Sequence, residues 1–352
     1  MARYLLDCAS QVERIKRKLG VVRLVDYLRE IFGADSHDYI LGDPISLDKV
    51  RAFETEHDIR LPDEYLLFLT RIGHAGGNKG KHWLKGLAGG PRYGIYQLGS
   101  EDQSAAVEDL LSLKEVATVG MLSDEQWRQT VDLPNEVMDE LGDEEYDALY
   151  KRMHCGILPV AYGGCTDFTG LIMSGPLRGA IIESNSNYDV WRTSPPMVVA
   201  PDFLSWYEGW LDGILGGDVV KSWRRPRLDQ DEIFWRLGEY IERSPNAFLL
   251  LYSLQMAGGI ENLDPKYLAS LWKWYREADD KRTREYLLAL LAQFDYENAR
   301  AEIAGTSEGL FIHILATRAP EYIRDWNDHL KEMESTGQQD LIDAADYLRD
   351  IA

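Results

Sequence analysis

The sequence contains little cysteine and no long apolar run. Three cysteines among 352 residues are too few, and odd in number, for a disulfide framework, which favours a reducing compartment. The longest apolar stretch, around residues 247–257, is too short to span a bilayer. The N-terminus begins like a signal peptide, but Asp7 interrupts the apolar segment. We therefore expect a cytoplasmic protein that does not insert into a membrane.

Positive charge is also scarce. The chain has 38 basic and 59 acidic residues, and its net charge is −21. Direct binding to a nucleic-acid backbone requires lysine and arginine to neutralise phosphates, so the composition argues against nucleic acid as a direct partner. Residues 101–147 alone carry 15 acidic and 2 basic groups. A segment of this charge attracts a basic protein instead.

The motifs of common cofactor and catalytic sites are missing. The glycine-rich loop 76–83 lacks the first glycine of a phosphate-binding loop, and His82 occupies the place of its serine or threonine. His154 and Cys155 are adjacent, but successive side chains in a strand point to opposite faces and do not form a nucleophile–base pair. The histidines and cysteines also lack the paired short spacing of a zinc site. We expect no cofactor, no metal and no enzymatic activity.

The segment 45–72 predicts two short amphipathic helices. Ser46 is suited to cap the first helix, whose apolar face includes Phe53. Pro62 is suited to open the second helix, in which Phe68 belongs to a buried stripe. Two such short helices need a larger apolar surface to pack on, and predicted strands follow them.

Helices and strands alternate irregularly from the N-terminus to about residue 216. We predict helices over 1–33, 107–113, 131–150 and 201–215, and strands at 93–98, 156–161, 170–173, 180–183, 190–192 and 198–199. Together they predict an α+β domain in which helices pack on a mostly antiparallel sheet. The acidic residues 99–150 form an insert in this domain, and the simplest interpretation of the insert is a solvated acidic surface.

From residue 228 onward the apolar spacing is helical throughout. Helices of 12–18 residues separated by glycine, proline and asparagine predict an all-α domain, either a small bundle or a stack of helix pairs, although no repeat of fixed length is present. The predicted domains are an N-terminal helical extension at 1–40, an α+β domain at 41–220 with the insert at 99–150, and a helical domain at 228–352. The C-terminal helices offer a surface for homo-oligomer formation.

Four segments within residues 41–216 resemble the SMI1/KNR4 family of the SUKH group. They are the I-x-L-P-x-E-Y-x-x-F-L pattern at 59–69, YGIYQL at 93–98, GILPVAYGGCTDFTGLIMSG at 156–175 and FLSWYEGWLDGIL at 203–215. Many bacterial members of the group are immunity proteins, and eukaryotic members are linked to cell-wall synthesis and signalling. The resemblance implies a SUKH-like fold whose surface binds another protein.

Candidate partner-binding residues are aromatic or charged residues near loops, because Trp, Tyr and Arg contribute most to protein interfaces. The candidates are Trp83, Arg92, Tyr162, Asp167, Trp191 and Arg192, together with Asp139, Glu140, Asp143 and Glu144 of the insert. The alternative for Asp167 is a side chain that only caps its turn. The alternative for the loop 76–83 is a flexible loop without a partner.

The resemblance implies an immunity protein that neutralises a cognate polymorphic toxin by stoichiometric binding. A basic toxin domain fits the charge of the insert, which would then speed association. The second interpretation is a regulatory scaffold of the SMI1/KNR4 type that binds proteins through its C-terminal helices. The third is an enzyme that uses His154, Cys155 or the loop 76–81.

Overall fold

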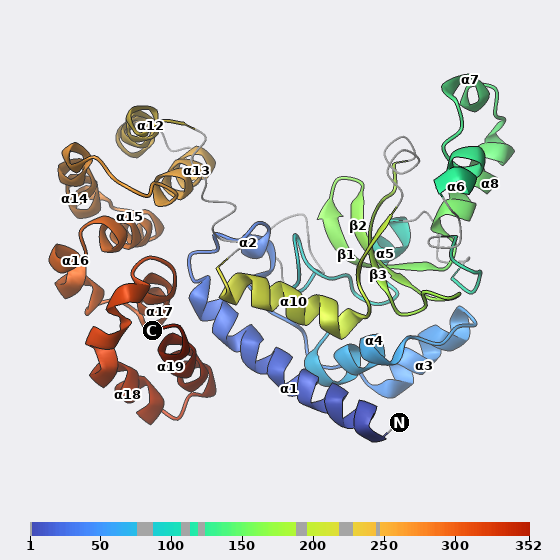
Figure 1. Ribbon diagram of the computed structural model, residues 1–352, viewed down its shortest axis with the longest axis horizontal. Coiled ribbons are helices and arrows are strands. Elements are labelled where there is room, and N and C mark those ends of the chain that lie inside the picture. The colour runs from blue at the N-terminus through green and yellow to red at the C-terminus, as the bar shows by residue number, and fades with distance from the viewer. Residues whose placement is uncertain are drawn as a thin grey trace. The chain divides into compact units, whose positions relative to one another are not determined.

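A computed structural model describes residues 2–75, 87–106, 113–118, 124–187, 196–217, 228–243 and 247–352 (Figure 1). The chain divides into two compact units. The first contains Met1–Lys16 and Phe32–Trp210, and the second contains Arg17–Ile31 and Leu211–Ala352. Residues Trp83, Trp191 and Arg192, and the predicted strand at 190–192, lie outside the described ranges.

The first unit is built on a four-stranded antiparallel sheet, as predicted. Its strands β1 (Ile157–Gly164), β2 (Asp167–Ile172), β3 (Ile181–Asn185) and β4 (Met197–Ala200) follow one another in the order of the chain. A tight turn at 165–166 connects β1 to β2, and a longer turn at 173–180 connects β2 to β3. Buried side chains on nearly every position of β1 to β3 explain why these strands were recognisable as apolar runs.

The predicted strand at 93–98 is wrong. The backbone N–H of Tyr96 donates to the carbonyl of Val160 over 2.9 Å, so the segment does run beside β1. However, Ile95 forms only isolated bridges there, to Ala88 and to Ala161. Left-handed backbone at Gly94 (φ 112°) interrupts the extended conformation of a strand, and the residues that flank the segment, Arg92 and Gly99, are left-handed as well.

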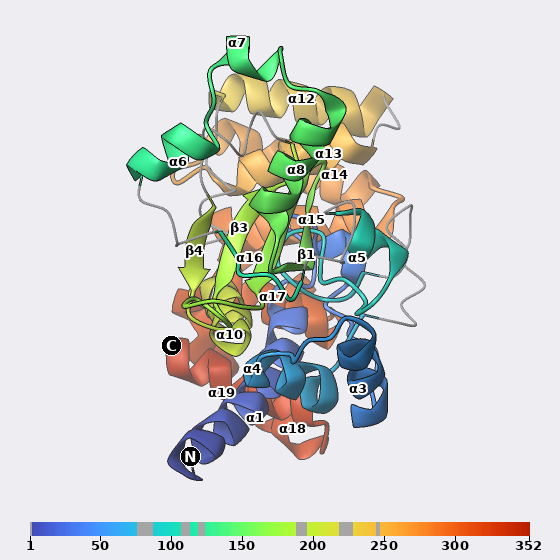
Figure 2. The same cartoon turned by 90° about the vertical axis from the view of Figure 1, so that its right-hand side faces the viewer.

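Helices α3 (Leu47–Glu56), α4 (Asp63–Leu67) and α10 (Phe203–Leu215) lie on one side of the sheet in both Figure 1 and Figure 2. The predicted helix pair is confirmed: Ser46 caps α3, and α4 continues as a π-helical turn over Phe68–Ile72. Phe68 is fully buried, and its ring centroid lies 4.8 Å from Phe203 and 4.7 Å from Tyr207. This aromatic cluster joins α4 to α10.

The remaining helices of this unit differ from the predicted ranges. α1 (Ala2–Val25), whose residues 17–25 belong to the second unit, continues through Gly20 and ends eight residues before position 33; residues 26–28 form a turn, and Arg29 adopts a left-handed conformation. The predicted helix at 131–150 is split by Gly142 into α7 (Asn135–Met138) and α8 (Asp143–His154). The others are α2 (Ala34–His37), α5 (Glu101–Ala105) and α6 (Asp124–Thr130). The predicted helix at 107–113 falls almost entirely outside the described residues.

The second unit is all-α, as predicted, and forms a stack of helix pairs. Its helices are α12 (Gln230–Arg243), α13 (Ala247–Gly258), α14 (Leu268–Glu277), α15 (Lys281–Phe294), α16 (Tyr296–Ile303), α17 (Glu308–Thr317), α18 (Asn327–Ser335) and α19 (Gln339–Ile351). Even-numbered and odd-numbered helices form two columns in Figure 1. Within the odd-numbered column, α13, α15, α17 and α19 contact one another in succession.

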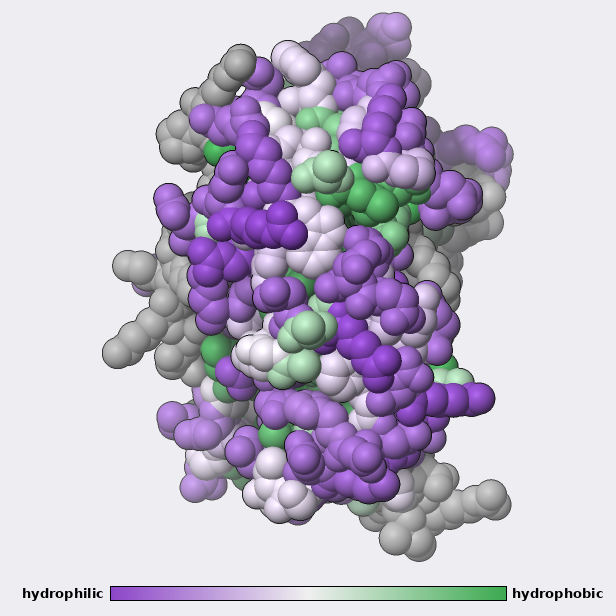
Figure 3. All heavy atoms as spheres, turned by 90° about the vertical axis from the view of Figure 1, so that its left-hand side faces the viewer, coloured by the Kyte–Doolittle hydropathy of each residue, from purple (hydrophilic) through white to green (hydrophobic). Residues whose placement is uncertain are grey.

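Residues 17–31 complete the core of this helical unit. Val21, Val25 and Leu28 are buried in the same apolar cluster as α15, α17 and α19. The Tyr286 hydroxyl of α15 also donates to the carbonyl of Leu28 over 3.1 Å. The exposed face of the unit shown in Figure 3 is mostly hydrophilic. Within the described ranges, no helix has both the length and the apolar character needed to cross a membrane.

Candidate functional site

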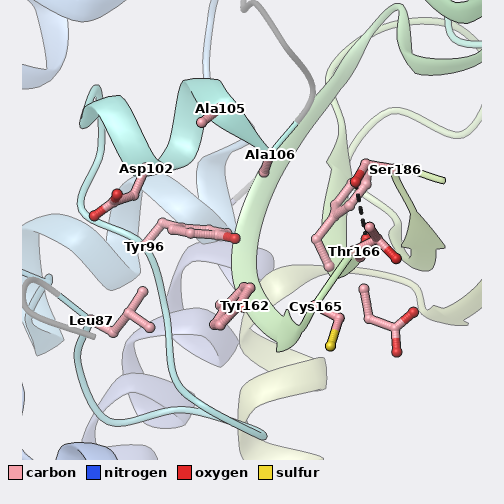
Figure 4. A pocket seen from close by; sticks show the side chains of 11 residues that line it. Leu87, Tyr96, Asp102, Ala105, Ala106, Tyr162, Cys165, Thr166 and Ser186 are labelled. Atoms are coloured by element: carbon pink, nitrogen blue, oxygen red, sulfur yellow. Dashed lines mark hydrogen bonds between the residues drawn. The ribbon is translucent and has the colours of Figure 1, made fainter. Parts of the chain in front are cut away.

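A pocket of about 270 Å³ lies between the β1–β2 turn, α5 and the segment around Tyr96 (Figure 4). It is slightly smaller than pockets for drug-sized ligands, which start at about 300 Å³. The residues that give it chemical character are Tyr96, Asp102, Tyr162, Cys165, Asp167 and Phe168.

The β1–β2 turn brings one wall of this pocket together. Tyr162 on β1 pairs with Phe168 on β2, and residues directly opposite each other in an antiparallel pair share a face of the sheet. Gly164 has φ 101°, which permits the tight turn, and a Cβ atom built there would lie 2.7 Å from the ring of Tyr93. Cys165 is exposed at the tip of the turn.

Helix α5 holds Asp102 at the opposite wall. Ser100 caps the helix by accepting a hydrogen bond from the backbone N–H of Gln103 over 3.2 Å. The buried Gln103 side chain donates to the carbonyl of Pro159 on β1 over 2.6 Å and accepts from Gly99 over 2.8 Å. These hydrogen bonds hold α5 on the sheet and thereby position the exposed carboxylate of Asp102.

Two tyrosine rings lie between these walls. The ring centroids of Tyr96 and Tyr162 are 6.2 Å apart with an interplanar angle of 55°. Burial raises the pKa of the Tyr96 hydroxyl, and the neighbouring Tyr162 and the negative charge of Asp102 raise it further. Burial also raises the pKa of Tyr162. Both hydroxyls therefore stay protonated at neutral pH and can donate hydrogen bonds.

A charged cluster borders the pocket on the sheet. The Arg92 guanidinium lies between two carboxylates, with Nη1 3.4 Å from Asp167 Oδ2 and Nη2 3.4 Å from Glu183 Oε2. Asn185 donates to the other oxygen of Asp167, and Thr169 donates to Glu183 over 3.3 Å. Burial raises the pKa of Glu183, although Arg92 opposes this shift. Asp167 thus belongs to a network across β2 and β3 and does more than cap its turn.

The structure therefore brings together Arg92, Tyr162 and Asp167 among the predicted partner-binding residues. Tyr96 and Asp102 were missed as site residues. The Ser-x-x-Gln pattern at 100–103 is a recognised signal for a helix start and could have placed α5. Nothing in the sequence indicates that Asp102 comes near the turn 60 residues later.

The acidic candidates of the insert lie elsewhere. Asp139, Glu140, Asp143 and Glu144 are all exposed, and the described lining of the pocket contains none of them. Asp143 and Glu144 belong to the first turn of α8, where negative charge stabilises a helix. Glu145 accepts a hydrogen bond from the backbone N–H of Gly142 over 3.1 Å.

His154 and Cys155 have separate partners. His154 is buried, with Nδ1 3.1 Å from the carbonyl of Tyr150 and Nε2 3.4 Å from that of Asn185, and burial lowers its pKa. The Cys155 thiol donates to the carbonyls of Arg152 (3.2 Å) and Val116 (3.3 Å). Among the described residues, no group of three or more His, Cys, Asp or Glu side chains is arranged to hold a metal ion.

The fold and site define an α+β domain with an aromatic, charged pocket at one end of its sheet. Residues 44–209 match the model of the SMI1 / KNR4 family (SUKH-1). This segment is an SMI1/KNR4 domain, which confirms the resemblance, and it contains every residue of the pocket and of the Arg92 cluster. A search of curated proteins and a search of solved structures each found no match.

Proposed function

We propose that this chain is a non-catalytic, intracellular protein-binding protein, and that it is an immunity protein that neutralises a cognate polymorphic toxin by stoichiometric binding. The observation that carries this proposal is the surface of the SMI1/KNR4 domain around the pocket. It combines Tyr96 and Tyr162 with the charged groups of Arg92, Asp102 and Asp167. Aromatic residues and arginine beside a concave surface are the usual anchors of a protein interface.

Arg92 is the side chain best placed to change partners on binding. Its guanidinium is 42 % exposed, and both of its carboxylate contacts are as long as 3.4 Å. A carboxylate on the toxin could therefore replace one of these contacts with a shorter, bidentate pair. The toxin would be neutralised by occlusion. A toxin bound at the pocket would have its active site or substrate path covered by the surrounding surface of this chain.

The acidic insert supports the choice of a basic partner. Residues 101–147 carry 15 acidic and 2 basic groups, and four candidate carboxylates on and before α8 are exposed. Concentrated charge of one sign raises the association rate of an oppositely charged partner by about 10- to 1,000-fold at low ionic strength. A nuclease-type toxin with a basic cleft has the complementary charge.

The contacts of the candidate catalytic residues support a role without catalysis. Both nitrogens of His154 and the thiol of Cys155 face backbone carbonyls, so neither side chain is positioned to activate the other. A hydrolase built on this pair would need them within hydrogen-bond reach of each other.

The helical unit favours a second candidate function, a regulatory scaffold. Stacked helix pairs expose long surfaces that bind other proteins. On this unit Trp235 of α12 is 61 % exposed and Tyr252 of α13 is 39 % exposed. Exposed aromatic side chains of this kind anchor partners or a second copy of the chain.

Capture with the full-length chain as bait, followed by co-expression, tests the proposal. The captured protein is identified by mass spectrometry and expressed with and without the chain. We expect it to stop growth alone, to be harmless with the chain, and to form a complex of defined stoichiometry by light scattering. A Tyr162→Ala variant should lose this protection, whereas Lys331→Ala, which changes an exposed side chain on α18, should keep it. A stable complex with no effect on growth would favour the scaffold.

A further inference from the structure

We propose that the pocket of the SMI1/KNR4 domain binds one cationic side chain, an arginine, presented by the partner protein. The inference deepens the proposed function by naming the group that the pocket recognises. The statement that this arginine belongs to a toxin rests on the proposed function. The binding of arginine by the pocket can be tested separately.

Charge selects a cation. The described residues that line the pocket include the carboxylates of Asp102 and Asp167 and no lysine, arginine or histidine. The cation beside it, Arg92, is already placed between Asp167 and Glu183. These carboxylates would therefore repel an anionic ligand. A cationic ligand would be attracted to them, above all to the exposed carboxylate of Asp102.

The aromatic rings select the same class of ligand. Figure 4 shows the Tyr96 and Tyr162 side chains converging on the space between α5 and the β1–β2 turn, with Asp102 at one end of that space and Cys165 at the other. The negative face of an aromatic ring attracts a cation within about 6 Å of the ring centroid. With their centroids 6.2 Å apart, the two tyrosines can both approach one bound cation.

Shape and hydration favour arginine over lysine. A guanidinium is planar, is less strongly hydrated than an ammonium, and can stack on a ring while donating hydrogen bonds in its own plane. The protonated tyrosine hydroxyls add polar contacts at the rim, and the carboxylate of Asp102 is a bidentate acceptor. A cavity of about 270 Å³ has room for this side chain and lies just below the usual range of pockets for drug-sized ligands, about 300–1,000 Å³.

Blocked tripeptides with a central arginine, lysine or citrulline between glycines test the inference without any partner. Citrulline keeps the shape of arginine and removes its charge. Binding to the full-length chain is followed by NMR chemical-shift titration. We expect the arginine peptide to bind with a Kd in the millimolar range, the lysine peptide to bind several-fold more weakly, and the citrulline peptide at least about tenfold more weakly.

Three variants locate the binding. Asp102→Asn keeps the shape of the side chain and should weaken arginine-peptide binding about tenfold. Tyr162→Leu should weaken it about fivefold through loss of a ring face. Asp328→Asn, a matched neutralisation of an exposed aspartate on α18, should leave it unchanged. Thermal unfolding of each variant verifies that the fold is retained.

Equal binding of arginine and citrulline peptides, no binding of the arginine peptide, or an unchanged Kd in Asp102→Asn would each overturn the inference. The two proposals can fail independently. If the arginine peptide binds as expected but no captured protein is neutralised, the immunity function falls and the arginine pocket stands. If a toxin is neutralised equally well by Asp102→Asn, the pocket assignment falls and the immunity function stands.

Discussion

A buried charge cluster in the helical unit gives the most direct test of how that unit is held together. The Arg318 side chain on the turn after α17 is fully buried and donates to the buried carboxylate of Glu30. Its other terminal nitrogen donates to Gln293 over 2.9 Å. His313 lies nearby, with Nε2 3.8 Å from Glu30 and Nδ1 2.6 Å from the carbonyl of Val25. Glu30 thus ties residues 17–31 to α15 and α17.

Replacing Glu30 by Gln removes the negative charge and leaves a buried guanidinium without its counter-ion. Removing one member of a buried ion pair costs about 3–5 kcal/mol. A domain of this size shifts its Tm by about 2–4 °C per kcal/mol, so the transition of the helical unit should fall by about 6–20 °C. The double change Glu30→Leu with Arg318→Met removes both charges and should recover most of this loss, because an apolar pair often matches a buried ion pair.

Calorimetry of the full chain measures these shifts, since two units can give separate transitions. Glu334→Gln is the control, because its partner Arg349 is about one-third exposed and an exposed pair contributes at most about 1 kcal/mol. A shift in Glu30→Gln no larger than in this control would refute the reasoning. A double variant as unstable as the single one would show that the loss comes from packing and not from the stranded charge.

Three further predictions concern the first unit. Neutralising the insert should slow association with a basic partner at least about tenfold at low salt, measured by stopped-flow against ionic strength, and leave the unfolding temperature unchanged. The residues to change are Asp139, Glu140, Asp143 and Glu144. Burial alone would raise the pKa of Glu54, but its hydrogen bonds from Arg51 and from the backbone N–H of Leu61 outweigh this and lower it below 4.5. The stabilisation by the charged Glu54 is therefore complete above pH 4.5 and is lost as the pH falls through the lower pKa of the folded state. Glu54→Gln should lower the free energy of unfolding by about 1–3 kcal/mol at pH 7 and by progressively less in acid. Gly164→Ala should destabilise the domain by about 1–3 kcal/mol in urea titrations, because it forces a side chain into left-handed backbone against Tyr93; a neutral result would mean that the turn relaxes freely.

Local patterns predicted the parts of the fold that depend on near neighbours. The α3–α4 pair follows from Ser46, Pro62 and the spacing of Phe53 and Phe68, all of which act within one or two helical turns. The segment 93–98 shows the opposite case. Its aromatic and β-branched side chains favour a strand, but the left-handed conformation of Gly94 is decided by the path the chain takes beside β1.

The pocket was predictable only in part for the same reason. Tyr162 and Asp167 lie in one hairpin, so a single sequence window contains both of them. Arg92 lies 75 residues before Asp167, and the prediction that it contacts a partner came from its chemistry alone. Asp102 reaches the pocket through the bond of Gln103 to Pro159, a pairing that no periodicity reveals.

Residues 17–31 show why the division of the chain could not be obtained from hydrophobic spacing. Val12 and Ile15 are buried in one unit and Val21 and Val25 in the other, although all four continue the same helical stripe of α1. An apolar stripe specifies which face of a helix is buried but not which surface covers it, because burial of apolar area has no directional preference. The directional contacts decide the second question. The buried carboxylate of Glu30 needs a counter-ion, which the buried guanidinium of Arg318 supplies. The hydrogen bond from the Tyr286 hydroxyl to the carbonyl of Leu28 fixes the register of residues 17–31 on α15. Polar pairs separated by more than 250 residues therefore assign this segment to the helical unit, and such pairs become visible only in three dimensions.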